Sequence, residues 1–126
     1  MIVVLANGCF DGCHPGHLAH LKAAAELGTR LIVAVTKDKY VNKGPNRPIY
    51  NQRDRVESVK ALRCVDWVLL VKDSFEALEI VNPDIFVKGV EYKENLKEKE
   101  YCLEHQIKMV FLSPRPEIRT SLLRKR

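Results

Sequence analysis

The chain of 126 residues contains no apolar run long enough to cross a bilayer, so nothing in it predicts a transmembrane helix. Its first apolar run covers only residues 2–6 and has no basic residues before it. We therefore expect no secretory signal peptide, and a cytoplasmic location. Internal repeats, low-complexity segments and a domain linker are also missing. The length and these absences predict one globular domain over residues 1–126.

The four cysteines of the chain form no C-x-x-C pair. In a cytosolic protein we expect them to be free thiols. Two of them lie close to histidines, and the set that could be drawn as a zinc site is Cys9, Cys13, His14 and His17. These ligand types suit zinc, but their spacing matches no standard zinc module. We favour a phosphate-binding turn over a zinc site here.

The net charge is +5, which is compatible either with nucleic-acid or membrane binding or with a pocket for a small polyanion. The basic residues are scattered, except at residues 124–126, and no aromatic residues alternate with them. We therefore favour the small anion and read residues 124–126 as a solvated tail. No nucleic-acid or membrane partner is expected.

Apolar runs alternate with segments of helical spacing along the whole chain. Strands are predicted at residues 1–6, 31–35, within 66–71, at 84–89 and at 107–112. Helices are predicted at 15–27, 51–62, from 73 to before Pro83, at 91–104, and from 120. On helix 91–104 we expect Leu96 and Leu103 to make the apolar contacts and the charges to face solvent. The alternation predicts an α/β fold: a single Rossmann-like domain with a five-stranded parallel sheet and helices on both faces.

The segment Gly8–His17, with the sequence GCFDGCHPGH, joins the first predicted strand to the first predicted helix. In this strand–turn–helix order, main-chain N–H groups at the helix N-terminus can bind an anion, and glycines let the ligand approach. The imidazoles of His14 and His17 donate N–H groups in either protonation state, so both can bind phosphate oxygens. The alternative is that they are turn residues with local hydrogen bonds.

Cations follow the predicted strands. The irregular segment 36–49 carries Lys37, Lys39, Lys43 and Arg47, and it is either a solvated loop or a flap that brings cations over phosphates. Arg53 lies in the first turn of helix 51–62, where the helix dipole disfavours a cation. A bound anion would explain it, and so would a surface salt bridge to Asp54 or Glu57. Lys88 ends a strand and faces either a ligand or solvent.

Gly8-Cys9-Phe10-Asp11 followed by His14-x-Gly16-His17 resembles G-x-F-D-x-x-H-x-G-H, the signature of the cytidylyltransferase-like nucleotidyltransferases. Further likenesses lie at residues 47–53, 65–68, 83–92 and 115–121. Within the family, residues 66–68 and 87–89 are most similar to the heptose 1-phosphate adenylyltransferase domain of ADP-heptose synthase. Glycerol-3-phosphate cytidylyltransferase, FMN adenylyltransferases and a catalytically silent nucleotide-binding module are the alternatives. The chain departs from the family at Cys9 and at Arg119, where serine is usual.

The resemblance implies transfer of a nucleoside monophosphate from ATP or CTP to a phosphorylated acceptor, with release of pyrophosphate. It implies Mg²⁺ held through the NTP phosphates, no metal ligands from the protein, and a homodimer. The residues implied in catalysis are His14, His17 and Lys43. Those implied in nucleotide binding are Gly8, Cys9, Phe10, Gly16, Lys88, Arg115, Thr120 and Ser121. Those implied at the acceptor are Asp11, whose polar contact could instead lie near the metal, and Arg53. Either Arg53 or Lys88 could serve the acceptor phosphate or the nucleotide.

Overall fold

The computed structural model describes residues 1–12, 15–41, 44, 47–89 and 97–113. In chain order its elements are β1 (Val3–Gly8), α1 (Pro15–Ala25), β2 (Arg30–Thr36), the 3₁₀ helix η1 (Asp38–Tyr40), α2 (Gln52–Lys60), β3 (Trp67–Val71), α3 (Ser74–Val81), β4 (Ile85–Gly89), α4 (Lys99–Glu104) and β5 (Lys108–Leu112). The predicted helix from residue 120 lies outside the described residues. No described helix has the length and apolarity that a bilayer crossing requires.

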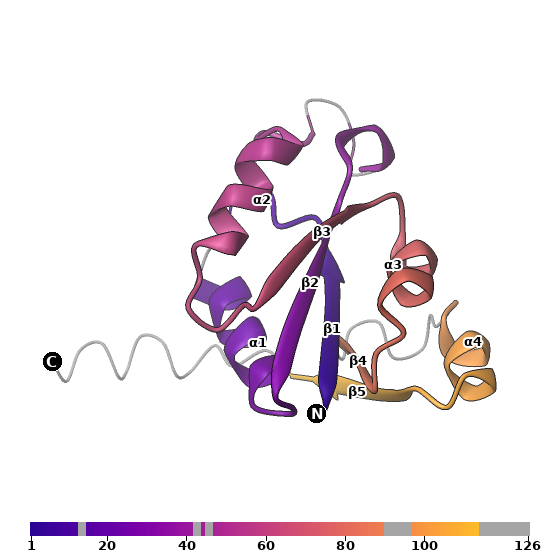
Figure 1. Ribbon diagram of the computed structural model, residues 1–126. Helices are drawn as coiled ribbons and strands as arrows, with labels where there is room; N and C mark the ends of the chain where they lie inside the picture. Colours follow the sequence, from indigo (N-terminus) through magenta and orange to yellow (C-terminus); the bar gives the residue numbers. More distant parts are fainter. Residues whose placement is uncertain (13–14, 42–43, 45–46, 90–96, 114–126) are drawn as a thin grey trace, which may run out of the picture.

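The five strands form one parallel sheet in the order β3-β2-β1-β4-β5. Helices α1 and α2 lie on one side of this sheet and α3 and α4 on the other (Figure 1). The predicted α/β Rossmann-like fold is therefore confirmed. The first strand lies at the centre, with β2 on one side and β4 on the other.

Alternation of side chains along the strands creates two hydrophobic cores, one on each face of the sheet. In β1, Val4 and Ala6 belong to the core that also contains Leu21 of α1 and Val59 of α2. Leu5 points the other way. The residues that share its core are Ala34, Val71, Ala77, Leu78, Phe86, Cys102 and Ile107. Strands buried on both faces explain why the strand segments read as continuous apolar runs.

Side-chain caps define the beginning of two helices. The Asn51 side chain accepts a hydrogen bond from the Asp54 N–H at 2.8 Å at the start of α2. The Asp73 carboxylate does the same for the Glu76 N–H at 2.9 Å at the start of α3. Each cap satisfies a main-chain donor that has no partner within the helix. Both caps agree with the sequence pattern.

The region after β4 differs from the expectation of one helix over residues 91–104. The helix α4 covers only Lys99–Glu104, and residues 90–96, including Leu96, lie outside the described part of the chain. Leu103 is 72% exposed rather than packed, and Cys102 is the buried residue of this helix. The expectation of a wholly solvated charged face is also wrong, because Glu98 is only 4% exposed. Its partners across the fold explain that burial.

Candidate functional site

The carboxyl ends of β1 and β4 define the place where an open α/β sheet usually binds its ligand. The chain leaves β1 towards β2 on one side and later returns to β4 on the other, which makes β1/β4 the switch point of the topology. Ala6 of β1 pairs with Val87 of β4. The next residues along each strand are therefore close to this crevice, and they include Gly8 and Lys88.

Two residues in the turn after β1, Phe10 and Gly12, have positive φ angles. Gly12 has a φ of +86°, a region that L side chains rarely adopt, and Phe10 has a φ of +52°. The Phe10 ring is 6% exposed and joins the core. A Cβ atom added at Gly8 would lie 3.0 Å from this ring. A larger residue at position 8 would therefore require the Phe10 ring to shift by a few tenths of an ångström.

His17 lies in the first turn of α1, directly above this turn. Its imidazole contacts the Phe10 ring edge-on, with 5.5 Å between ring centroids. Gly16 is exposed beside it at the helix N-terminus. The Phe10 contact restricts the orientation of the His17 ring. The helix terminus, Gly16 and His17 therefore form one donor-rich surface next to the β1 end.

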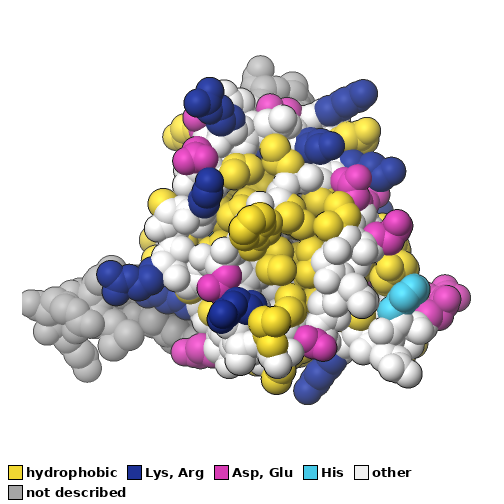
Figure 2. Space-filling view, viewed as in Figure 1, with side chains coloured by type: hydrophobic (Ala, Val, Ile, Leu, Met, Phe, Trp, Pro, Cys, Tyr) yellow, Lys and Arg dark blue, Asp and Glu magenta, His cyan; other side chains and the backbone are white. Residues whose placement is uncertain are grey.

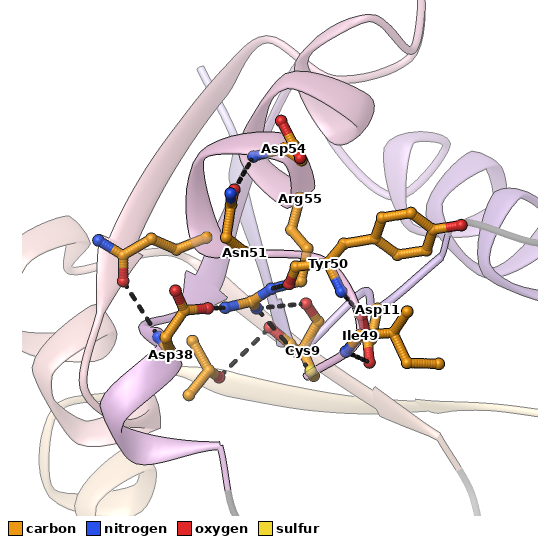
Figure 3. A network of polar contacts seen from close by, with 11 residues as sticks. Cys9, Asp11, Asp38, Ile49, Tyr50, Asn51, Asp54 and Arg55 are labelled. Atoms are coloured by element: carbon orange, nitrogen blue, oxygen red, sulfur yellow. Dashed lines mark hydrogen bonds and ion pairs between the residues drawn. The ribbon is translucent and has the colours of Figure 1, made fainter. Parts of the chain in front are cut away.

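Asp11 connects the turn to the segment that precedes α2. One carboxylate oxygen accepts the Ile49 N–H at 2.7 Å and the other accepts the Tyr50 N–H at 2.8 Å (Figure 3). Arg47 lies 3.5 Å away, and the Asp11 side chain is only 7% exposed. Burial raises the pKa of Asp11, but the Tyr50 and Ile49 amides and Arg47 together hold it below its ordinary value. The carboxylate is therefore ionised at neutral pH and positions residues 47–50.

Arg55 of α2 is the buried centre of the same region, with a side chain that is 0% exposed. Its Nη2 lies 2.6 Å from Asp38 Oδ1, its Nη1 donates to the Cys9 carbonyl at 2.8 Å, and its Nε donates to the Tyr50 carbonyl at 3.0 Å (Figure 3). The Cys9 sulfur is 3.8 Å from Nη1. One guanidinium thus joins the turn after β1, the 3₁₀ helix after β2 and the start of α2.

The arginine of α2 that lies in the core is Arg55 and not Arg53, the arginine expected to bind a ligand. Arg53 is exposed in the first turn of α2, whereas Arg55 is 1% exposed. A signal for Arg55 was available, because it stands four residues before Val59 and therefore on the face of the helix that enters the core. The role of Arg53 towards an acceptor remains a prediction.

Lys88, at the end of β4, pairs with Glu98 rather than pointing freely into solvent. Its Nζ lies 3.2 Å and 3.1 Å from the two carboxylate oxygens of Glu98, and its side chain is 19% exposed. Ser74, the first residue of α3, donates its hydroxyl to the same carboxylate. Sequence reasoning missed both partners, although Glu98 stands four residues before the buried Cys102, as Arg55 does before Val59.

Residues 5–126 match the family described as cytidylyltransferase-like. The chain belongs to the cytidylyltransferase-like family. Similar curated proteins include "Bifunctional protein HldE" of Gluconobacter oxydans, 45% identical over 97 residues, which are 74% of this chain and 20% of that protein. The protein of the same name from Nitrosococcus oceani is 48% identical over 94 residues, 71% of this chain and 20% of that protein. The chain spans about a fifth of the length of these relatives.

Solved structures show the same fold. The lipopolysaccharide core biosynthesis protein from Thermoplasma volcanium is 30% identical, with a TM-score of 0.79 over 91% of this chain and 98% of that one. Pantoate-beta-alanine ligase from Francisella tularensis has a TM-score of 0.67 at 14% identity over 89% of this chain and 59% of that one, a likeness of fold alone.

Several predicted residues lie outside the described part of this cytidylyltransferase-like chain. They are His14, Lys43, Arg115, Thr120 and Ser121, together with Cys13 and Arg119. Among the described residues, Gly8, Cys9, Phe10, Asp11, Gly16 and His17 come together at the end of β1, and the topology brings Lys88 to the neighbouring strand end. Arg53 is exposed in the first turn of α2.

No three His, Cys, Asp or Glu residues within the described ranges gather closely enough to hold a metal ion. The zinc alternative needs Cys13 and His14, so it stays untested. The carboxylate of Asp11, at the end of β1, already accepts two main-chain N–H groups. Mg²⁺ commonly binds to phosphate oxygens and water rather than to a cage of protein ligands. The described residues therefore fit a magnesium ion that arrives with the nucleotide.

Proposed function

We propose that this chain is a nucleotidyltransferase that moves an adenylyl group from MgATP to a sugar phosphate, with heptose 1-phosphate as the first candidate acceptor. The main support for this proposal is the 41–48% sequence identity to proteins named HldE. The chain also keeps the whole pattern from Gly8 to His17. Because the match covers about a fifth of proteins called bifunctional, we assign to it one of their two activities.

The proposed reaction is an in-line displacement at the α-phosphorus of ATP. An oxygen of the acceptor phosphate forms a new bond to the α-phosphorus while the bond from the α-phosphorus to the oxygen that bridges to the β-phosphate breaks, and pyrophosphate leaves. A phosphate monoester is already ionised near neutral pH, so the protein need not supply a nucleophile or a strong base. Its task is to position the two substrates and to neutralise charge that develops in the transition state.

We assign this task to the donors at the end of β1. His17 and the N–H groups at the start of α1 would bind the triphosphate, with Phe10 keeping the His17 ring in place. Lys88 would contribute a cation from the other side of the crevice. His14, Lys43, Arg115, Thr120 and Ser121 stay in the roles that the resemblance implies, as does Arg53 at the acceptor. Asp11 and Arg55 would keep the loop segments around the substrates in position.

The decisive experiment measures pyrophosphate release for a matrix of substrates. ATP, CTP, GTP and UTP are each combined with heptose 1-phosphate, glycerol 3-phosphate and FMN. The proposal predicts turnover with ATP and heptose 1-phosphate. Turnover only with CTP and glycerol 3-phosphate would replace it by the cytidylyltransferase alternative. Binding of a nucleotide without turnover for any pair would favour a silent nucleotide-binding module.

The variant His17→Ala tests the site itself. We expect turnover to fall by about two to three orders of magnitude, as when one preorganised donor to a transition-state charge is removed. His105→Ala is the matched control, because His105 is an exposed histidine on the far side of the sheet, after α4. Near-normal turnover of His17→Ala in a folded protein would refute the assignment.

We also propose a cytoplasmic homodimer that acts on small molecules rather than on nucleic acid. Hydrophobic side chains gather over the middle of one face of the molecule (Figure 2). On β3, Trp67 is 65% exposed and pairs with the half-buried Ile32 of β2. An exposed apolar surface of this kind supports self-association. Sedimentation equilibrium would contradict the dimer if it gave the monomer mass at micromolar concentration.

A further inference from the structure

Glu98 is a buried acidic residue whose side chain serves no helix cap. It precedes α4 at the N-cap position, where a side-chain oxygen commonly accepts a main-chain N–H, but it makes no such bond. Its two oxygens instead lie 3.2 Å and 3.1 Å from Lys88 Nζ, and one of them accepts the Ser74 hydroxyl. The carboxylate is therefore committed to Lys88 and not to its own helix.

This cluster lies at the edge of the sheet where we place the nucleotide. Lys88 follows Val87, which pairs with Ala6 of β1, so the backbone of residue 88 lies next to the strand that leads into the turn at Gly8. Ser74 begins α3 at the same edge, since α3 follows β3 directly. Lys88 thus comes from β4 itself, Ser74 from the connection between β3 and β4, and Glu98 from the connection between β4 and β5.

The pair is oriented with its cation outward. The Glu98 side chain is 5% exposed and the Lys88 side chain 19% exposed. The Lys88 ammonium also lies 5.8 Å from the centroid of the Phe86 ring. Burial raises the pKa of Glu98, but the Ser74 hydroxyl and Lys88 hold it below its ordinary value, so the carboxylate is charged at neutral pH. An anion in the crevice would meet the ammonium before it met the carboxylate.

A lysine side chain has a flexible four-carbon stem and a strongly hydrated ammonium, so its charge is mobile unless a neighbouring group restrains it. Both oxygens of one carboxylate restrain it here, and the hydroxyl of Ser74 restrains the carboxylate in turn. Because the Lys88 side chain is already restrained, less conformational entropy is lost when a ligand binds to it.

We propose that Glu98 is a positioning residue that holds the Lys88 ammonium at the β1/β4 crevice for contact with the phosphate groups of the nucleotide. The inference rests on the proposed function, because it takes a nucleoside triphosphate as the ligand. Ser74 acts indirectly, because its hydroxyl fixes the orientation of the Glu98 carboxylate.

The test uses Glu98→Gln, which keeps the size of the side chain and an acceptor oxygen but removes the charge. The dissociation constants of MgATP and of inorganic tripolyphosphate are measured by calorimetry for the wild type, Glu98→Gln, Lys88→Met and the double variant. Glu98→Gln is expected to weaken both ligands about tenfold, the scale of one charge-assisted contact. In the Lys88→Met background the same change is expected to have no further effect, because Glu98 acts through Lys88.

Glu100→Gln is the matched control, because it removes the same charge from an exposed position of α4. It should leave both dissociation constants unchanged. Melting temperatures of all variants separate loss of folding from loss of binding. If Glu98→Gln does not fold, Ser74→Ala takes its place, with an expected weakening of about threefold that again disappears with Lys88→Met.

Equal or tighter binding by Glu98→Gln would overturn the inference, because Glu98 would then only repel the ligand. A loss that persists in full with Lys88→Met would overturn it as well. If the wild type binds ATP but releases no pyrophosphate with any acceptor, the proposed function is wrong. The dissociation constants of the four proteins still test the role of Glu98 in that case. A wild type that binds neither ATP nor tripolyphosphate overturns both.

Discussion

Replacement of Arg55 by methionine is expected to destabilise the protein by about 3 kcal/mol. Removing one partner of a buried ion pair costs about 3–5 kcal/mol, and loss of the two hydrogen bonds to the Cys9 and Tyr50 carbonyls adds to the cost. The lower end applies because the Asp38 side chain is 38% exposed, so its carboxylate regains water when the guanidinium is gone. For a domain of this length the melting temperature should fall by about 10 °C.

The assay combines Arg55→Met with Asp38→Asn in a double-mutant cycle, followed by urea and thermal unfolding. Asp38→Asn alone leaves a buried guanidinium with a neutral partner and should cost about 2 kcal/mol. The unfolding free energy of the double variant should lie within about 0.5 kcal/mol of that of Arg55→Met, because the two residues interact directly.

Arg53→Met is the control for this cycle. Arg53 is an exposed arginine in the first turn of the same helix, and its replacement should change stability by less than about 0.5 kcal/mol. The reasoning is refuted if Arg55→Met melts within about 1 °C of the wild type, or if the losses of the two single variants add up in the double variant.

Two further predictions concern acid stability and the packing of α4. The pKa values of Asp11 and Glu98 are lowered in the folded protein, so their contribution to stability is complete above their unfolded values near 4 and is lost as the pH falls through the folded values. Melting temperatures measured from neutral to acid pH should therefore fall less steeply for Asp11→Asn and for Glu98→Gln than for the wild type; parallel curves would contradict this. Leu103→Ala should change the unfolding free energy by less than about 0.5 kcal/mol because the side chain is exposed, whereas Phe86→Ala should cost about 3–5 kcal/mol. Urea unfolding checks the pair, and a similar loss for both would show that α4 packs through the face expected from the sequence.

The fold was predictable because its signals are local. Strands buried on both faces appear as continuous apolar runs, and each is followed by turn residues and a segment of helical period. Asn51 and Asp73 mark the beginning of helices through bonds to donors only three residues away. The pattern from Gly8 to His17 likewise places a strand, a turn and a helix in one short stretch of sequence.

The partners of the buried charges were not predictable in the same way. Arg55 bonds to Cys9 and Asp38, which are 46 and 17 positions away. Lys88 pairs with Glu98, and Glu98 in turn accepts the hydroxyl of Ser74 from a different connection. A hydrophobic pattern shows which side of a helix is buried, but a charge on that side breaks the pattern, and its partner depends on how the elements pack.

The amino-acid sequence by itself determined the order of strands and helices, the donor-rich turn at the end of β1 and the family to which the chain is similar. These features depend on side-chain periodicity and on residues close together in the chain. Only the tertiary structure decided that the buried Arg55 pairs with Asp38, that Asp11 holds residues 49 and 50, and that Glu98 restrains Lys88. The physical reason is that a buried charge is stable only with partners, and packing of the sheet and helices brings those partners together.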